Sequence, residues 1–258
     1  MGQIHAKRPV IKLRLLADRQ FGAVALLGRV LGMVLYGTSY VIPQFLATIA
    51  GYNSYQSGQI VLLSGLPSLA MMAIVPILLK RIDVRVAVAS GLCIMGASAL
   101  IDSSLTAGSD GSDFVASQLM RGVGQILGML FLSQACVRSV SREDSGDASG
   151  LFNAFRNLGG SFALAGIATI QDQRVWLHSR RMEETLNANA HLVQAKVASL
   201  GGLYSAAPQI ESQIAQQALV MTYNDIFTIM GVGTLIVLPL VLFLRPFASD
   251  AAPDAPMH

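Results

Sequence analysis

Long apolar stretches separated by short polar connections dominate the chain. An α-helix needs roughly 20 apolar residues to cross a hydrocarbon core about 30 Å thick. Six windows qualify, near 21–43, 58–79, 86–105, 114–137, 150–170 and 225–244. They lack the alternation of barrel strands, and a helix satisfies its own backbone hydrogen bonds in lipid. The pattern therefore predicts an all-α membrane protein, built as a bundle of six transmembrane helices.

Composition strengthens this prediction. Hydrophobic residues make up 53% of the 258-residue chain and charged residues 13%, whereas a soluble domain carries about 25% charged residues. The 18 Lys and Arg residues occur in short clusters between the apolar windows, so the net charge of +3 does not indicate nucleic-acid binding. The first twenty residues have no uninterrupted apolar core and no small-residue cleavage site, which argues against a signal peptide.

The distribution of Lys and Arg over the connections predicts the orientation. With the N-terminus inside, the inner segments hold eleven of these residues and the outer connections hold four, all in one long segment. We therefore expect a multi-pass protein of the bacterial inner membrane with both termini in the cytoplasm. The expected organisation is a basic leader at 1–20, five helices within 21–170, a long periplasmic segment at 171–224, a last helix at 225–246 and a tail at 247–258.

The long outer segment, about 173–222, predicts two short amphipathic helices. Its apolar residues recur at helical spacing in two groups. Such helices cap the bundle or lie on the membrane surface, or they form a docking surface for a partner. The first alternative is favoured, because an apolar stripe of this size is ordinarily buried within its own chain. The two groups are Leu186, Ala190, Val193, Val197 and Leu200, and Ile210, Ile214, Ala218 and Met221.

Three arginines, Arg29, Arg121 and Arg156, fall inside the apolar windows. Each costs about 2.5–3.5 kcal/mol at a helix centre on insertion scales. Arg156 is roughly six residues, or about 9 Å, from the cytoplasmic end of its helix and can reach the headgroups. Arg29 and Arg121 should instead face a protein interior or an aqueous cavity.

Helical spacing places these arginines beside small and polar residues. Gly124 and Gly128 form a small-xxx-small pair that lets two helices approach closely. Close packing explains the glycines, but the polar residues on the same faces require a cavity or an interhelical hydrogen bond. One face carries Asn153, Arg156, Gly160 and Ala163, and the other carries Arg121, Gly124, Gln125 and Gly128.

Enzymatic machinery is not evident in the sequence. No G-x-x-x-x-G-K-[ST] or G-x-S-x-G string occurs, and "GVGQILG" at 122–128 lies within a span with the wrong glycine spacing for a dinucleotide site. Cys93 and Cys136 lie in apolar runs, where a thiol behaves as a small hydrophobe. We therefore expect neither an enzyme nor a cofactor or metal site.

The carboxylates are all placed near the ends of the predicted helices or in loops. Asp102 falls at an outer helix end, and no Asp or Glu is expected deep within a span. Because a proton-coupled transporter usually needs a titratable group at depth, these six helices look incomplete as a proton-driven machine.

The order of several segments resembles the C-terminal part of EmrB/QacA-type drug transporters of the major facilitator superfamily, which have fourteen transmembrane helices. The segments are "PVIKLRLLADRQF", "YVIPQFLATIAGYNSYQSGQIVL", "LLKRIDVR", "QLMRGVGQ" and "SGLFNAFRNLGGSFALAGIATI". The resemblance covers about residues 9–246 and corresponds to the last six helices. Its most specific elements are the long outer segment and the string of Asn153, Arg156, Gly159 and Gly160, whose glycines are expected to pack helices.

Two departures from the family pattern stand out. Lys80, Arg81, Asp83 and Arg85 resemble the family's basic cytoplasmic loop motif, but the glycine usual near its start is replaced around Pro76. The first eight helices are also missing, including those that carry the family's membrane-embedded acidic residue and its antiporter motif. The chain therefore resembles half of a transporter.

The resemblance implies proton-driven efflux of amphipathic compounds by alternating access, through a cavity between two six-helix bundles. The implied partners are membrane lipid, an N-terminal half or a second copy, and a periplasmic adaptor protein at 173–222. The alternative is a membrane-embedded fragment or interaction protein that does not transport and docks an adaptor through the same segment. The residues expected to line or brace the cavity are Arg29, Arg121, Gln125, Asn153 and Arg156.

Overall fold

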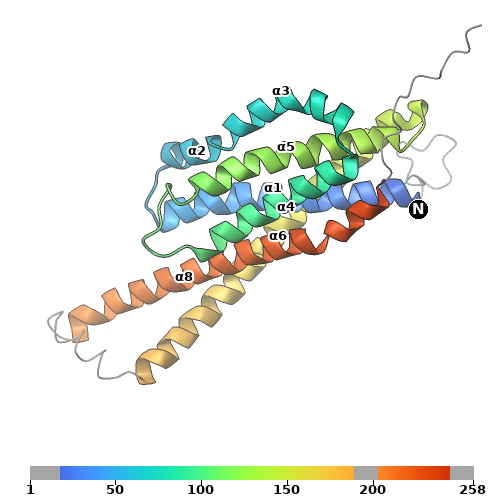
Figure 1. Cartoon of the computed structure of the whole chain (residues 1–258). Helices are drawn as coiled ribbons and strands as arrows, with labels where there is room; N and C mark the ends of the chain where they lie inside the picture. The colour runs from blue at the N-terminus through green and yellow to red at the C-terminus, as the bar shows by residue number, and fades with distance from the viewer. Residues whose placement is uncertain (1–17, 189–202, 245–258) are drawn as a thin grey trace, which may run out of the picture.

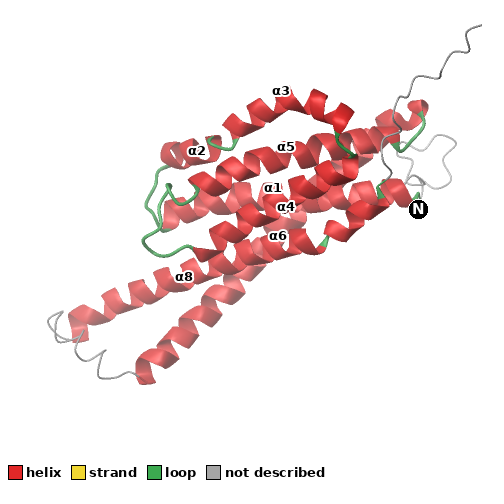
Figure 2. Cartoon of the chain, in the orientation of Figure 1, coloured by secondary structure: helices red, strands yellow, loops and turns green. Residues whose placement is uncertain are grey.

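The computed structural model describes residues 18–188 and 203–244, in which every regular element is helical (Figures 1 and 2). The all-α bundle predicted from the apolar pattern is confirmed. In chain order the elements are α1 (Arg19–Thr48), α2 (Ser54–Leu62), α3 (Gly65–Arg81), α4 (Val84–Ile101), the 3-10 turn η2 (Asp102–Ser104), α5 (Val115–Arg138), η3 (Arg142–Asp144), α6 (Ser145–Ala188), α8 (Leu203–Ile236) and η4 (Leu238–Phe243).

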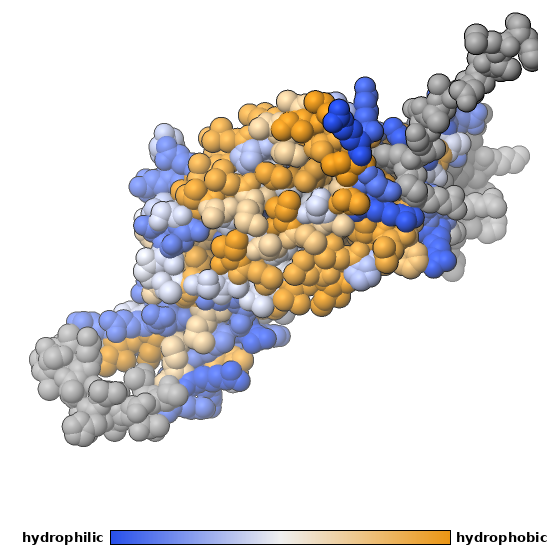
Figure 3. Space-filling model, in the orientation of Figure 1, coloured by the Kyte–Doolittle hydropathy of each residue, from blue (hydrophilic) through white to orange (hydrophobic). Residues whose placement is uncertain are grey.

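The helices pack as a bundle in which α1 and α5 are surrounded by the others. α1 packs most extensively against α6, α5 lies between α3 and α4, and α8 packs against α4 and α6. The α2–α3 pair lies along the outside of α5 (Figure 1). Apolar residues cover the body of the bundle, and polar residues gather at its two ends (Figure 3). This distribution is what a bilayer requires of a bundle that spans it.

Five helical stretches of the described chain are long and apolar enough to cross a membrane. They are Arg19–Thr48, Ser54–Arg81, Val84–Ser104, Val115–Arg138 and Pro208–Phe243. The sixth predicted window, 150–170, lies on α6, which is not among them. Asn153, Arg156 and Asn157 lower the hydropathy of this window, although the helix that carries them packs along α1 within the bundle.

Two predicted spans are interrupted, so their prediction as single helices is wrong. The span near 58–79 is divided between α2 and α3, with a break at residues 63–64. The span near 225–244 ends its α-helix at Ile236 and continues as η4, because Pro239 lacks a backbone N–H and disfavours helical geometry in the residue before it. In contrast, α3 continues through Pro76 without ending.

Of the two separate short helices predicted in the long segment before the last span, the second is wrong, because its residues lie within α8, and most of the first lies outside the described residues. α6 is a single helix of 44 residues and α8 one of 34 residues, far longer than the roughly 20 that a bilayer needs. Their outer parts extend together beyond the other helices (Figure 1). Ala218, on α8, is buried, and Met221 is exposed. Ala190, Val193, Val197 and Leu200 lie outside the described residues, as does the side chain of Leu186.

One end of the bundle collects the start of α1, the start of α4 and the end of η4. Arg19 lies over the ring of Phe243, 4.6 Å from its centroid. Arg85 Nε donates a hydrogen bond to the Leu244 carbonyl. Asp83 caps α4 by accepting a hydrogen bond from the Arg85 backbone N–H at 2.8 Å, which satisfies an otherwise unpaired donor. The basic loop motif therefore ties α4 to η4, the last element that the structure describes.

Candidate functional site

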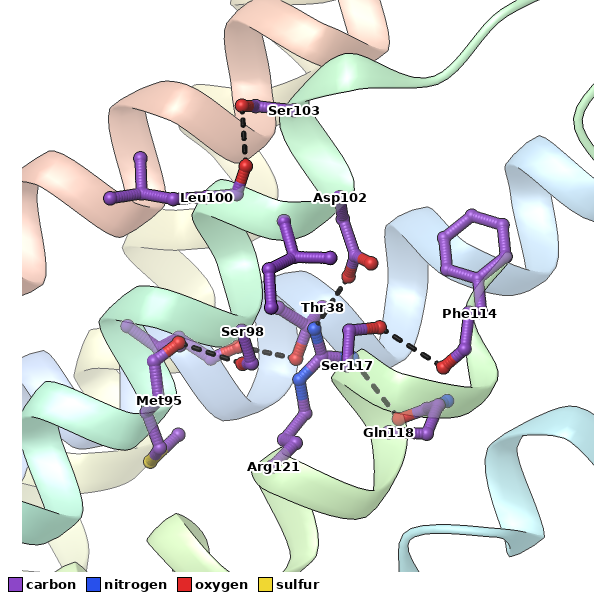
Figure 4. Close-up of polar contacts among 12 residues, drawn as sticks. Thr38, Met95, Ser98, Leu100, Asp102, Ser103, Phe114, Ser117, Gln118 and Arg121 are labelled. Atoms are coloured by element: carbon purple, nitrogen blue, oxygen red, sulfur yellow. Dashed lines mark hydrogen bonds and ion pairs between the residues drawn. The ribbon is translucent and has the colours of Figure 1, made fainter. Parts of the chain in front are cut away.

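A buried ion pair joins α4 to α5. Asp102 follows the last residue of α4, and its Oδ2 lies 2.9 Å from Arg121 Nη2, with 5% of the Arg121 side chain and 0% of the Asp102 side chain exposed. Arg121 Nη1 also donates to Gln118 Oε1 at 3.1 Å (Figure 4). The sequence placed Asp102 at a helix end, and the structure adds that this helix end is enclosed by protein. Arg121 faces the protein interior.

Close contact between α4 and α5 brings the two charges together. A Cβ on Gly91 would lie 2.6 Å from the backbone nitrogen of Gly128, and one on Gly124 would lie 2.8 Å from the Gly91 carbonyl oxygen. These distances leave no room for side chains, so only glycines allow this approach. The structure thus places Gly124 and Gly128 at a helix contact whose third member, Gly91, was not singled out from the sequence.

The ion pair leaves two polar atoms unsatisfied. Asp102 Oδ1 and Arg121 Nε are buried without a hydrogen-bond partner among the described residues. The neighbouring hydroxyls donate within their own helices: Ser117 to the Phe114 carbonyl at 3.0 Å and Ser98 to the Met95 carbonyl at 2.8 Å (Figure 4). A buried polar atom without a partner costs free energy, so this pair is not optimised for stability alone.

A second close contact joins α1 to α6. A Cβ on Gly32 would overlap the Arg156 carbonyl oxygen, and one on Gly159 would overlap the Arg29 carbonyl oxygen. Gly160 lies in the same way against the ring of Tyr36. The backbones of the two helices therefore touch directly at the level of both arginines.

The side chains of Arg29 and Arg156 emerge beside this contact. The Arg29 guanidinium lies 4.3 Å from the centroid of the Phe162 ring, a cation–π geometry. Arg156 Nη1 lies 3.3 Å from Met129 Sδ on α5, and its buried Nε has no hydrogen-bond partner in the described chain. Both arginines are partly buried, and each is held by a soft, apolar partner.

Polar residues of α6 differ in what they contact. Asn153, a predicted cavity residue, is exposed and donates to the Ser149 carbonyl of its own helix at 3.0 Å. Asn157, not singled out from the sequence, accepts a hydrogen bond from the Tyr36 hydroxyl of α1 at 3.0 Å. The sequence signal that could have identified Asn157 is its position one helical turn after Asn153, on the same face of the helix. Gln125 is half-buried on α5.

The predicted site residues thus fall in two places. Arg121 belongs to the buried pair near the N-terminal end of α5, whereas Arg29, Asn153 and Arg156 follow the α1–α6 contact. Within the described ranges, no three His, Cys, Asp or Glu side chains gather in a way that could hold a metal ion.

Two cavities adjoin α1. The larger, about 730 Å³, lies between α1 and the α2–α3 pair. Its lining mixes polar and apolar groups, among them Ser39, Asn53, Ser57, Pro43, Val61 and Leu62, and Ser57 Oγ is buried there without a described partner. The smaller, about 320 Å³, lies between α1, α6 and α8 and is lined mainly by apolar side chains, including that of Phe162.

Comparison with known families identifies the fold. Residues 2–164, more than half of the chain, match the Major Facilitator Superfamily. The chain belongs to this superfamily. Its members are membrane transporters, which agrees with the apolar belt of the bundle (Figure 3).

Several relatives carry names that refer to resistance or to multidrug export. The chain is 25% identical over 246 residues to the colistin resistance protein EmrB of Acinetobacter baumannii, covering 92% of this chain and 48% of that protein. It is 26% identical over 245 residues to the multidrug export protein EmrB of Escherichia coli K12, covering 92% and 48%. It is 23% identical over 248 residues to the fatty acid resistance protein FarB of Neisseria gonorrhoeae, covering 95% and 49%. The chain spans about half the length of these relatives.

Proposed function

We propose that this chain forms the C-terminal half of a multidrug efflux transporter, which exchanges protons for amphipathic compounds by alternating access and needs an N-terminal half. The names of its EmrB relatives and the half-length match support this proposal. The observation that carries it is the polar surface along the α1–α6 contact.

That surface carries polar and charged groups that a face in contact with hydrocarbon normally lacks. Tyr36, whose side chain is 41% exposed, is hydrogen-bonded to exposed Asn157, and Asn153 is exposed one turn earlier on α6. Arg29 lies partly exposed near the middle of α1. Polar and charged groups within a span normally face a bundle interior or a water-filled cavity. We infer that this face of α1 and α6 borders the transport cavity, opposite a second bundle.

The 730 Å³ cavity beside α1 supports the proposal that the substrate is amphipathic. Ligand sites are mostly apolar with a few placed polar groups. Val61 and Leu62 offer the apolar part of such a lining, and Ser39, Asn53 and Ser57 the polar part. An amphipathic compound presents both kinds of surface at once.

The charge at the ends of the bundle supports an orientation with both termini in the cytoplasm of a bacterium. Lys80 and Arg81 lie in the last turn of α3, at the same end of the bundle as the start of α1 (Figure 1). Basic residues accumulate on the cytoplasmic side of a membrane, so this end faces inward in our proposal.

Transport of a fluorescent amphipathic dye by inside-out membrane vesicles tests the function. We expect dye movement driven by a proton gradient when the chain is co-expressed with the N-terminal half of an EmrB-type transporter, and none with either half alone. Arg156→Ala should reduce transport more than Arg156→Lys at equal membrane abundance. Gradient-driven transport by this chain alone, or none with both halves present and correctly inserted, contradicts the proposal.

A second candidate function is docking of a periplasmic adaptor, and the extension of α6 and α8 favours it. The outer parts of these helices project beyond the bundle with a largely polar surface (Figure 3). His178 Nε2 and Asp225 Oδ2, 2.8 Å apart, join them. Crosslinking from residues 171–184 in intact cells should capture one periplasmic protein if the extension docks an adaptor. Crosslinks to lipid alone argue against docking.

A further inference from the structure

The Asp102–Arg121 pair is built unlike a purely structural ion pair. Only one oxygen of Asp102 engages Arg121, at 2.9 Å, while Oδ1 is buried without a partner in the described chain. Arg121 keeps a second acceptor, Gln118 Oε1. The free Oδ1 can accept a proton, and Arg121 keeps a neutral hydrogen-bond partner when Asp102 does so. Asp102 can therefore exist in two protonation states.

The surroundings of Asp102 are otherwise uncharged. α5 presents Arg121 together with the neutral Gln118 and Ser117. α8 packs against η2 with Asn224, whose amide nitrogen donates to the Leu105 carbonyl at 2.8 Å. Among the described residues, Arg121 is the charged side chain that contacts Asp102. The charge of Asp102 therefore depends on this one partner.

Asp102 lies close to the outer surface although it is itself enclosed. Ser103 is partly exposed and Ser104 exposed, one and two residues further along η2. A proton needs to pass only this short turn to reach the carboxyl group. Buried charge, a single counter-ion and a short route to water thus occur together at one residue.

We propose that Asp102 is a proton-binding site of this half and that Arg121 is the counter-ion it releases when protonated. This inference rests on the proposed proton-driven exchange and places one coupling residue in the chain itself. The family resemblance assigns the membrane-embedded acidic residue to helices outside this chain, so Asp102 is a separate site.

The protonation step requires no other reactant. One proton from the outer aqueous phase binds Asp102 Oδ1. The neutral carboxyl group then donates to the oxygen of Ser117, the hydroxyl that faces Asp102 and whose own hydrogen is given to the Phe114 carbonyl. Arg121 keeps its charge and remains hydrogen-bonded to Gln118. The attraction between the ends of α4 and α5 is lost, and Arg121 is left as a buried cation hydrogen-bonded only to the neutral Gln118. Removal of the buried carboxylate charge offsets part of this cost. Deprotonation reverses the step.

Infrared difference spectroscopy of the purified full chain tests this directly. As the pH is lowered, we expect a carbonyl band of a protonated, dehydrated carboxylic acid in the wild type and loss of that band in Asp102→Asn. Ser117→Ala should shift the band, since its hydrogen-bond acceptor is removed. Asp113→Asn, which removes an exposed carboxyl group of the following loop, is the matched control and should retain the band.

A second variant tests the inference even when Asp102→Asn is unstable. If Asp102→Asn does not fold, Asp102→Asn/Arg121→Gln replaces the ion pair with a neutral amide pair and should also lack the band. A wild-type band that persists in both variants, or no such band while the protein stays folded, overturns the inference. Because the measurement uses this chain alone, failure of dye transport with the N-terminal half would contradict the proposed function and leave the spectroscopic result standing.

Discussion

Gly159 of α6 lies against Arg29 of α1 so closely that a side-chain carbon at position 159 would overlap the Arg29 carbonyl oxygen. Gly32 has the same relationship to the Arg156 carbonyl in the opposite direction. Because lipid offers no hydrophobic drive for helices to associate, such backbone contact supplies much of the attraction through van der Waals packing. These reciprocal contacts hold α1 and α6 at the face that we propose borders the cavity.

Substitution of Gly159 should therefore destabilise the bundle. We expect Gly159→Ala to lower the free energy of unfolding by about 1–3 kcal/mol, as overpacking does in tight contacts. Gly166→Ala on the same helix, where a Cβ meets open space, should cause no loss and serves as the control. Unfolding in detergent, followed by circular dichroism, compares the two. Equal stability of both variants would contradict the contact.

Removing one partner of the buried ion pair should be costly. Asp102→Ala leaves Arg121 buried without its counter-ion, and we expect a loss of about 3–5 kcal/mol in the free energy of unfolding. Asp102→Leu/Arg121→Met replaces both charges with apolar groups and should recover most of that loss. A double variant that is no more stable than Asp102→Ala would show that the two residues act independently.

Much of the fold could be predicted from the sequence, because each helix that spans lipid must be apolar over a fixed length. The limits of that rule explain the errors. It treats 58–79 as one span because the break at Leu63 and Ser64 introduces no charge and only one small polar side chain into the apolar run. The rule also cannot tell where α6 leaves the membrane. A helix satisfies its own backbone hydrogen bonds both in lipid and in water, so it can continue past the bilayer. The apolar group from Ile210 to Met221 thus lies within the single helix α8, where a separate short helix was expected.

The candidate site was only partly predictable. Periodicity identified Arg121 as a residue that must avoid lipid, but its partner Asp102 lies across a loop, and local pattern cannot pair residues from two helices. The same limit applies to Tyr36 and Asn157, which belong to α1 and α6. Glycine spacing pointed to Gly124 and Gly128, while Gly91, their neighbour on α4, has no second glycine four residues away in its own helix.

Acid should loosen the loop between η2 and α5. Hydrogen bonds from the Ser112 hydroxyl and from its backbone N–H, both 2.7 Å from Asp110 Oδ1, hold the pKa of Asp110 below its ordinary value. A lowered folded-state pKa means that these bonds stabilise the loop above the unfolded-state pKa, and that this contribution is lost as the pH falls through the folded-state pKa. Carboxyl NMR titration should show the Asp110 pKa rising towards its ordinary value in Ser112→Ala. An unchanged titration would rule out the Ser112 hydroxyl as the cause.

The outer extension depends on a contact between His178 of α6 and Asp225 of α8. Asp225 Oδ2 lies 2.8 Å from His178 Nε2 and 3.3 Å from Arg174 Nη1, and the His178 side chain is 7% exposed. Since His178 Nδ1 already lacks a described partner, Asp225→Ala would leave both ring nitrogens unsatisfied. We expect a cost of about 1–3 kcal/mol for this buried polar group, with little from the half-exposed Arg174.

That cost should appear as local opening and not as global unfolding, because these parts of α6 and α8 project beyond the other helices (Figure 1). Hydrogen exchange measured by mass spectrometry should show residues 171–184 and 208–222 exchanging several-fold faster in Asp225→Ala, while α4 and α5 keep their protection. Glu211→Gln, an exposed change on the same stretch of α8, should leave exchange unaltered. If protection of the extension is the same in both variants, apolar contacts such as that of buried Ala218 are sufficient to hold α6 and α8 together.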